Sequence, residues 1–110
     1  MHVSDLQAQL PLTHVAGPDA GSFDGVYAGD LLSRAMSHIQ PENLWITIMN
    51  NVNVIAVASL TEASAVLIAE DVTLTEEAKN AADEKGVPVY ASSESVYTLC
   101  CRIFRLQDAL

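Results

Sequence analysis

Basic residues are scarce in this sequence, because five lysines and arginines stand against fourteen acids and leave a formal net charge of -9. A protein that binds a phosphate backbone would work against this field, so we expect no nucleic-acid partner. Cysteine is nearly absent as well, and the only two, Cys100 and Cys101, are neighbours that rarely form a disulfide with each other. We therefore expect reduced thiols and neither a metal site nor a cofactor.

Long apolar runs and targeting segments are missing too. Polar residues interrupt the most apolar window, 52–69, which a lipid-buried helix rarely tolerates. The first residues lack a basic stretch followed by an apolar run and a cleavage site, so a cytoplasmic protein with no membrane contact is expected. The sequence also has no phosphate loop, dinucleotide fingerprint, nucleophile elbow or His-Glu-x-x-His motif. These absences favour a binding or interaction domain over an enzyme.

What the sequence does contain is apolar, since half of its 110 residues are hydrophobic. That length and content predict one compact domain over residues 1–110. From residue 25 onward, short apolar or β-branched runs alternate with segments of helical spacing. Alternation with short connections predicts right-handed crossovers and an α/β fold. The expected architecture has three layers: a mainly parallel sheet of four to five strands with helices on both faces.

The expected elements can be bounded from these patterns. Strands are predicted at 12–16, 26–28, 44–49, 65–69 and 87–90. Helices are predicted at 4–10, from 30 to before Pro41, at 54–60, from 73 to Gly86, and from 92 or 93 through 103. Propensity alone also allows a strand at 54–60, and the alternation favours the helix. The predicted N-caps are Ser4, Asp30, Asn53, Thr73 and either Ser92 or Ser93.

The carboxyl ends of parallel strands share one edge, and open α/β sheets bind ligands in the crevice there. Helix N-termini would direct backbone N–H groups into this crevice, while Asp30, Glu70 and Asp71 bring negative charge to it. A neutral ring, or a nucleotide bridged by a cation, suits that mixture better than a bare anion. The candidate ligand-binding residues are Asp30, Asn50, Asn51, Asn53, Ser92 and Ser93.

Each candidate also has an ordinary structural interpretation. Caps account for Asp30, Asn53 and Ser93, and asparagines are common in turns. Three asparagines within four positions nevertheless exceed what a turn requires. The two lysines, Lys79 and Lys85, fall in the helix that ends at Gly86, so we expect them away from the crevice.

The run GVYAGDLLS at 25–33, with LWITI at 44–48 and NVIAVA at 53–58, resembles the DRTGG-domain family over nearly the whole chain. The pentapeptide that names the family is absent, and Met49-Asn50-Asn51 stands where small members tend to have Gln-x-His. The resemblance implies the fold of the amino-terminal domain of HPr kinase/phosphorylase and self-association. It also implies that in some larger proteins the domain occurs together with nucleotide-sensing CBS domains. Kinase activity in that family belongs to a separate domain with a phosphate loop, which this sequence lacks.

Two functions are consistent with these observations. The first is a non-catalytic regulatory domain, a homodimer that senses a small nucleotide-like ligand at the strand-end crevice. The alternative is a regulatory scaffold that binds another protein and no small molecule, because a small domain this apolar covers excess surface by association.

Overall fold

The computed structural model describes residues 1–109 and centres on a five-stranded sheet with the order β1-β5-β4-β3-β2. β2, β3, β4 and β5 run parallel, and β1 pairs with β5 in the antiparallel direction. The predicted α/β fold with a mainly parallel sheet is confirmed. The strands are β1 (Thr13–Ala16), β2 (Val26–Ala28), β3 (Leu44–Thr47), β4 (Ala65–Ile68) and β5 (Val89–Ala91).

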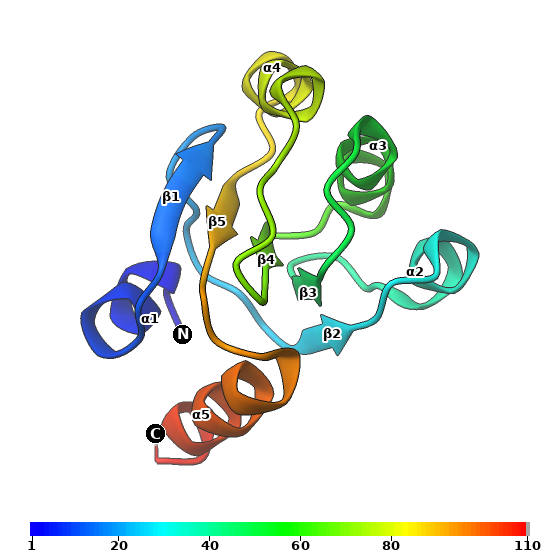
Figure 1. The fold of residues 1–110 in the computed structure, drawn as a ribbon. Coiled ribbons are helices and arrows are strands. Elements are labelled where there is room, and N and C mark those ends of the chain that lie inside the picture. Colours follow the sequence, from blue (N-terminus) through cyan, green and yellow to red (C-terminus); the bar gives the residue numbers. More distant parts are fainter. Residues whose placement is uncertain (110) are drawn as a thin grey trace.

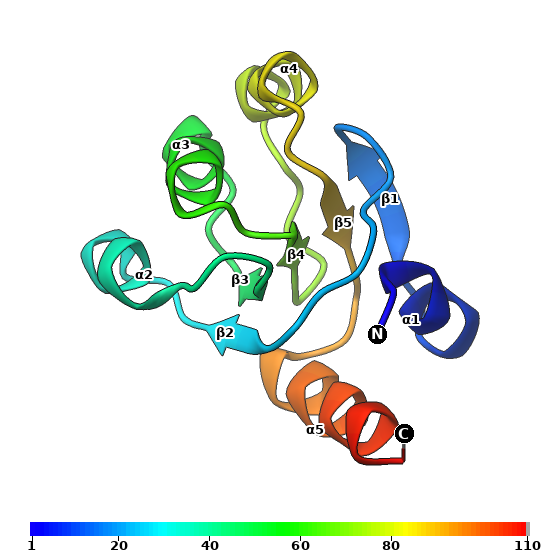
Figure 2. The ribbon, with the colours of Figure 1, turned by 180° about the vertical axis from the view of Figure 1, so that it is seen from behind.

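Five helices cover both faces of this sheet, which gives the three expected layers (Figures 1 and 2). One face carries the three helices that connect consecutive parallel strands, and the other carries the first and last helices of the chain. The two ends of the chain therefore lie on the same face. The helices are α1 (Val3–Gln9), α2 (Leu32–His38), α3 (Val52–Thr61), α4 (Glu76–Lys85) and α5 (Val96–Asp108).

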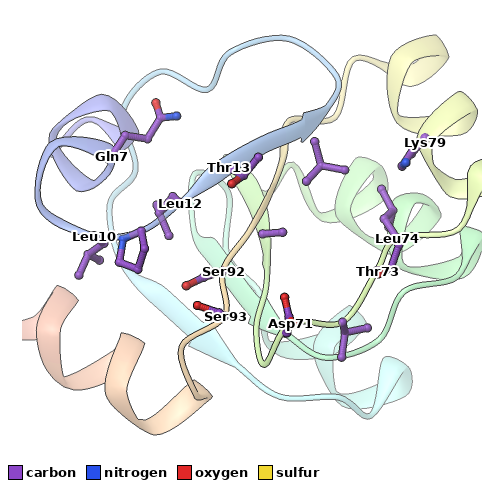
Figure 3. Close-up of a pocket in the computed structure, with 14 residues that line it drawn as sticks. Gln7, Leu10, Leu12, Thr13, Asp71, Thr73, Leu74, Lys79, Ser92 and Ser93 are labelled. Carbon is purple, nitrogen blue, oxygen red and sulfur yellow. The ribbon is translucent and has the colours of Figure 1, made fainter.

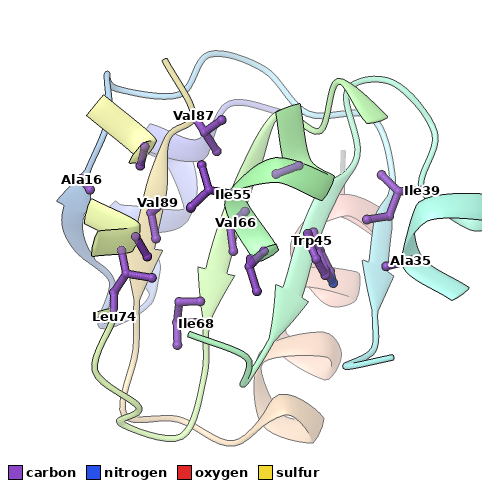
Figure 4. Packing of buried hydrophobic residues seen from close by; sticks show 14 residues of the cluster. Ala16, Ala35, Ile39, Trp45, Ile55, Val66, Ile68, Leu74, Val87 and Val89 are labelled. Carbon is purple, nitrogen blue, oxygen red and sulfur yellow. The ribbon is translucent and has the colours of Figure 1, made fainter. Parts of the chain in front are cut away.

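The central strands β3 and β4 are buried along their whole length. Their continuous apolar runs have the pattern expected of parallel strands covered on both faces. Because successive side chains point to opposite faces, Trp45 packs under α2 and α3 while Leu44 and Ile46 pack against α1 and α5. Figure 4 shows Trp45, Val66 and Val89 in the first of these cores.

The predicted N-caps of α1, α3, α4 and α5 are wrong by two or three residues. Asn51 caps α3 in place of Asn53, with its Oδ1 accepting the Asn53 N–H at 3.0 Å. Thr75 caps α4 in place of Thr73, and Ser95 caps α5 in place of Ser92 or Ser93. α1 begins at Val3 rather than after Ser4. Each loop offers several cap-forming residues in a row, and tertiary packing decides which one begins the helix.

Asp30 does not cap α2 either, because Leu31 occupies the cap position and makes no side-chain hydrogen bond. The Asp30 carboxylate instead bonds to the end of β3. The apolar side chains of this helix are also only partly buried. Leu31 is 64% exposed and Met36 is 43% exposed, whereas Ala35 and Ile39 lie in the core. α2 covers the sheet at the edge strand β2, so fewer of its positions have a neighbour to pack against.

Candidate functional site

The loops at the carboxyl ends of β4 and β5 are joined by backbone hydrogen bonds. The Asp71 N–H donates to the Ser92 carbonyl at 3.0 Å, and the Glu70 N–H donates to the Glu94 carbonyl at 2.9 Å. Glu70 and Asp71 both have left-handed backbone geometry, with φ of 61° and 62°. This geometry is uncommon for residues other than glycine and costs free energy that the surrounding contacts offset. The turn therefore has one fixed shape beside the end of β5.

A cavity of about 670 Å³ lies beside this turn, between the start of β1, the end of β5 and the segment that leads into α4. The antiparallel direction of β1 creates it, because Thr13 pairs with Ala91 and residues 10–12 therefore reach the edge where β5 ends. Figure 3 shows the lining side chains, with Leu10, Leu12 and Thr13 to one side, Asp71, Thr73 and Leu74 to the other, and Ser92 and Ser93 between them.

The cavity wall is mixed in character. Apolar side chains come from the segment that leads into and through β1, from the segment before α4 and from the end of β5. Hydroxyl groups of Thr13, Ser92 and Ser93 and the amide of Gln7 add polar positions. The exposed surface of the lining is more polar than apolar, and small-molecule sites combine apolar surface with a few placed polar groups. The apolar wall consists of Leu10, Pro11, Leu12, Val15, Val72, Leu74 and Ala91.

Two charged side chains complete the lining, Lys79 of α4 and Asp71 of the turn. The expectation that Lys79 lies away from the strand-end edge is wrong, because Lys79 lies near the start of α4, which follows the end of β4. The Lys79 side chain is one-third exposed, and its Nζ lies 3.3 Å from Oε1 of Glu76, which is itself 84% exposed. An exposed pair of this kind is weak and leaves the ammonium group available to a ligand.

Of the six residues predicted to bind a ligand, the structure places Ser92 and Ser93 on the cavity. Ser92 is 5% exposed, and its Oγ accepts a hydrogen bond from the Glu94 N–H at 3.1 Å. Ser93 is exposed at the cavity. Ser92 thus holds the β5–α5 loop in place, and Ser93 presents its hydroxyl group to the cavity.

The other four predicted residues do not line the cavity. Asp30 bonds to β3, and Asn51 caps α3. The Asn50 side chain donates from Nδ2 to the Thr73 carbonyl at 2.7 Å, and the backbone carbonyl of Asn50 accepts a hydrogen bond from the Thr75 N–H at 3.2 Å. Asn50 therefore supports the segment that forms one wall. Asn53 is exposed on α3.

Sequence reasoning missed most of the cavity wall. Leu10, Leu12 and Thr13 precede or begin the first strand, where a parallel sheet would place them at the opposite edge. Nothing in the sequence gives the direction of a short edge strand, so no pattern identified these residues. Leu74 was predicted to lie in the first turn of the helix that starts at residue 73, and Val72 was not considered, although both follow the turn at Glu70 and Asp71.

The described residues contain no group of three His, Cys, Asp or Glu side chains that is arranged to hold a metal ion. Within residues 1–109, no helix is long and apolar enough to cross a membrane. The charged groups on the cavity lining are the ammonium group of Lys79 and the carboxylate of Asp71.

Comparison with known proteins identifies the family to which this chain belongs. The model of the DRTGG domain matches residues 15–106. The match covers every helix and strand except α1, the first two residues of β1 and the last two residues of α5. This chain belongs to the DRTGG-domain family. The segments 25–33, 44–48 and 53–58 that suggested it all lie inside the match. No curated protein matches the chain.

A solved structure with a similar fold is the regulatory region of Clostridium perfringens pyrophosphatase, containing CBS and DRTGG domains, in complex with its activator diadenosine tetraphosphate. The TM-score is 0.68 at 11% sequence identity, and the likeness covers 88% of this chain. It covers 43% of that chain, so this DRTGG domain spans less than half the length of its structural neighbour. At this identity the likeness concerns the fold.

Proposed function

We propose that this DRTGG domain is a non-catalytic regulatory module that senses a small nucleotide-like ligand in the cavity between β1, β5 and α4. The observation that carries the proposal is the cavity itself, which lies at the carboxyl ends of β4 and β5. Ligands of open α/β sheets bind at this edge, and about 300–1,000 Å³ is the usual size of such pockets. Its apolar walls suit a base, and its polar groups suit a sugar and an acidic group.

The structural neighbour supports a nucleotide over other metabolites. That DRTGG-containing region is regulatory and is complexed with a dinucleotide activator. A regulatory role also agrees with the absence of catalytic motifs from the sequence. We propose a homodimer in the cytoplasm, a compartment in which Cys100 and Cys101 remain free thiols as they are in this structure.

Ligand-induced thermal stabilisation tests this function. The purified domain is heated with nucleosides, nucleotides, cyclic dinucleotides and phosphorylated sugars, with and without magnesium. A ligand at a hundred times its Kd stabilises the fold by about 2.7 kcal/mol, which raises Tm by roughly 10 °C or more.

A cavity-filling variant assigns the site. Thr13→Trp places a large side chain at the cavity wall and should abolish the shift. Ser33→Trp, on the exposed surface of α2, is the matched control and should retain it. A panel without any shift, or a shift that survives Thr13→Trp, would reject the cavity as a sensor site.

A protein-binding scaffold is the second candidate function, and the exposed face of α5 favours it. Tyr97 is 78% exposed and Phe104 is 65% exposed, seven residues apart on one side of the helix. Large exposed aromatic side chains are enriched where proteins meet. Replacing both with serine should release a bound protein, or halve the mass by light scattering if the partner is a second copy. Leu60→Ser on α3 removes an equally exposed apolar side chain and serves as the control.

A further inference from the structure

The cavity carries too little positive charge for a ligand with several phosphates. Lys79 is the one cation on its wall and Asp71 the one carboxylate, so the lining sums to zero formal charge. A phosphate group bound in a pocket needs charge-assisted hydrogen bonds to offset the loss of its hydration. Here one ammonium group provides them, and Ser93 and Thr13 add neutral hydroxyl groups.

The charges around the cavity also disfavour a ligand with several phosphates. The protein carries a net charge of -9, and Glu70 and Glu76 stand beside the two charged wall residues. Every additional negative charge on a ligand therefore meets repulsion that only salt reduces.

The charged and apolar side chains lie at different places along the cavity wall. Lys79 lies on α4 beside Leu74, while the serines and Asp71 lie nearer the end of β5 (Figure 3). A single anionic group at Lys79 leaves the half-buried side chains of Leu12 and Val72 for an uncharged ring. A carboxylate such as Asp71 accepts hydrogen bonds from sugar hydroxyl groups.

We propose that the ligand of this cavity is a nucleotide with one negative charge, such as a cyclic mononucleotide with a single phosphodiester, bound through Lys79. This inference rests on the proposed sensor function and names its ligand class. It separates this domain from recognition of a tetraphosphate of the kind bound by the pyrophosphatase regulatory region.

Isothermal titration calorimetry of the full chain without magnesium tests whether the cavity prefers a ligand with one negative charge. The probes share one base and differ in charge: adenosine, 3′,5′-cyclic AMP, AMP, ATP and diadenosine tetraphosphate, with the guanine and cytosine series run in parallel. Within the series of the preferred base, the cyclic mononucleotide should bind at least about tenfold more tightly than the triphosphate, a difference of about 1.4 kcal/mol. The gap should narrow between 25 mM and 200 mM salt, because salt weakens the repulsion of the triphosphate.

Two lysine variants test whether the phosphate of the ligand contacts Lys79. Lys79→Met should weaken cyclic mononucleotide binding by roughly tenfold or more, while adenosine binding changes by less than about twofold. Lys85→Met removes the same charge from the same helix outside the cavity and should change neither. An equal loss of nucleoside and nucleotide binding in Lys79→Met would overturn the contact between Lys79 and the phosphate.

The remaining outcomes separate this inference from the sensor function. Tighter binding of ATP or diadenosine tetraphosphate at the cavity, blocked by Thr13→Trp, would overturn the preference for one negative charge and leave the sensor function standing. No heat with any nucleoside or nucleotide at millimolar concentration would overturn both.

Discussion

The buried hydroxyl group of Thr47 donates a hydrogen bond to Oδ1 of Asp30 across 2.8 Å, and the Ile48 N–H donates to the same oxygen at 2.9 Å. Thr47 ends β3 and is 1% exposed, whereas Asp30 follows β2. The two bonds join the ends of neighbouring parallel strands. Asp30 therefore has a structural role at the strand-end edge, outside the cavity beside β5.

Asp30→Ala should lower the free energy of unfolding by about 1–3 kcal/mol, because it leaves a buried hydroxyl group with one partner fewer. Urea unfolding measures the change. Asp24→Ala, an exposed aspartate outside the sheet, removes the same charge and should have little effect. Equal losses in the two variants would mean that the bond to Thr47 contributes nothing.

The types of the elements could be predicted because their patterns are redundant. β4 is a continuous apolar run, and α4 has regular spacing of buried alanines before Gly86, so one misassigned residue changes little. Helix starts have no such redundancy. Asn51 and Asn53 are chemically equal as caps, and only the path of the chain out of β3 selects Asn51.

The ligand site was harder to predict than the fold. A cavity between β1 and α4 depends on which edge receives β1 and in which direction, and four residues of edge strand do not encode either. Ser92 and Ser93 follow β5 and could therefore be predicted at the strand-end edge, whereas the sequence contains no pattern that places Leu12 or Lys79 beside them.

Gly17 follows β1 with φ of 71°, and a Cβ atom built there would lie 1.9 Å from the Val87 carbonyl oxygen. Gly17→Ala should therefore destabilise the domain by about 2–5 kcal/mol, from backbone strain and overlap together. Gly21→Ala is the control, since its Cβ would meet nothing within 4 Å. Thermal unfolding of both variants tests this, and a similar Tm for the two would contradict it.

Glu62 ends α3 in the left-handed conformation, with φ of 60° and ψ of 36°. Glycine adopts this geometry without the clash of a Cβ atom, so Glu62→Gly should stabilise the domain by about 0.5–1 kcal/mol. Glu77→Gly, within the first turn of α4, removes the same charge from helical backbone and should destabilise by about 1 kcal/mol. Urea unfolding decides, and a destabilised Glu62→Gly variant would refute the cap argument.

Cys100 is the thiol whose ionisation the fold opposes. It packs against the core between the sheet and α5, and this burial, with a smaller effect of Cys101, raises its pKa above the ordinary 9.0. The unfolded chain therefore loses this proton at lower pH than the folded chain. The contribution of Cys100 to stability is complete below the unfolded pKa and is lost as pH rises through the folded pKa.

Alkylation of a Cys101→Ser variant isolates that thiol. Iodoacetamide reacts with the thiolate, so the pH at half-maximal rate should be higher for the folded protein than for the same protein in urea. Above pH 9, Cys101→Ser should also lose stability more steeply than the double variant that adds Cys100→Ala, because only the former carries the titrating group. Identical alkylation profiles in the folded and unfolded states would show that burial leaves the Cys100 thiol unaffected.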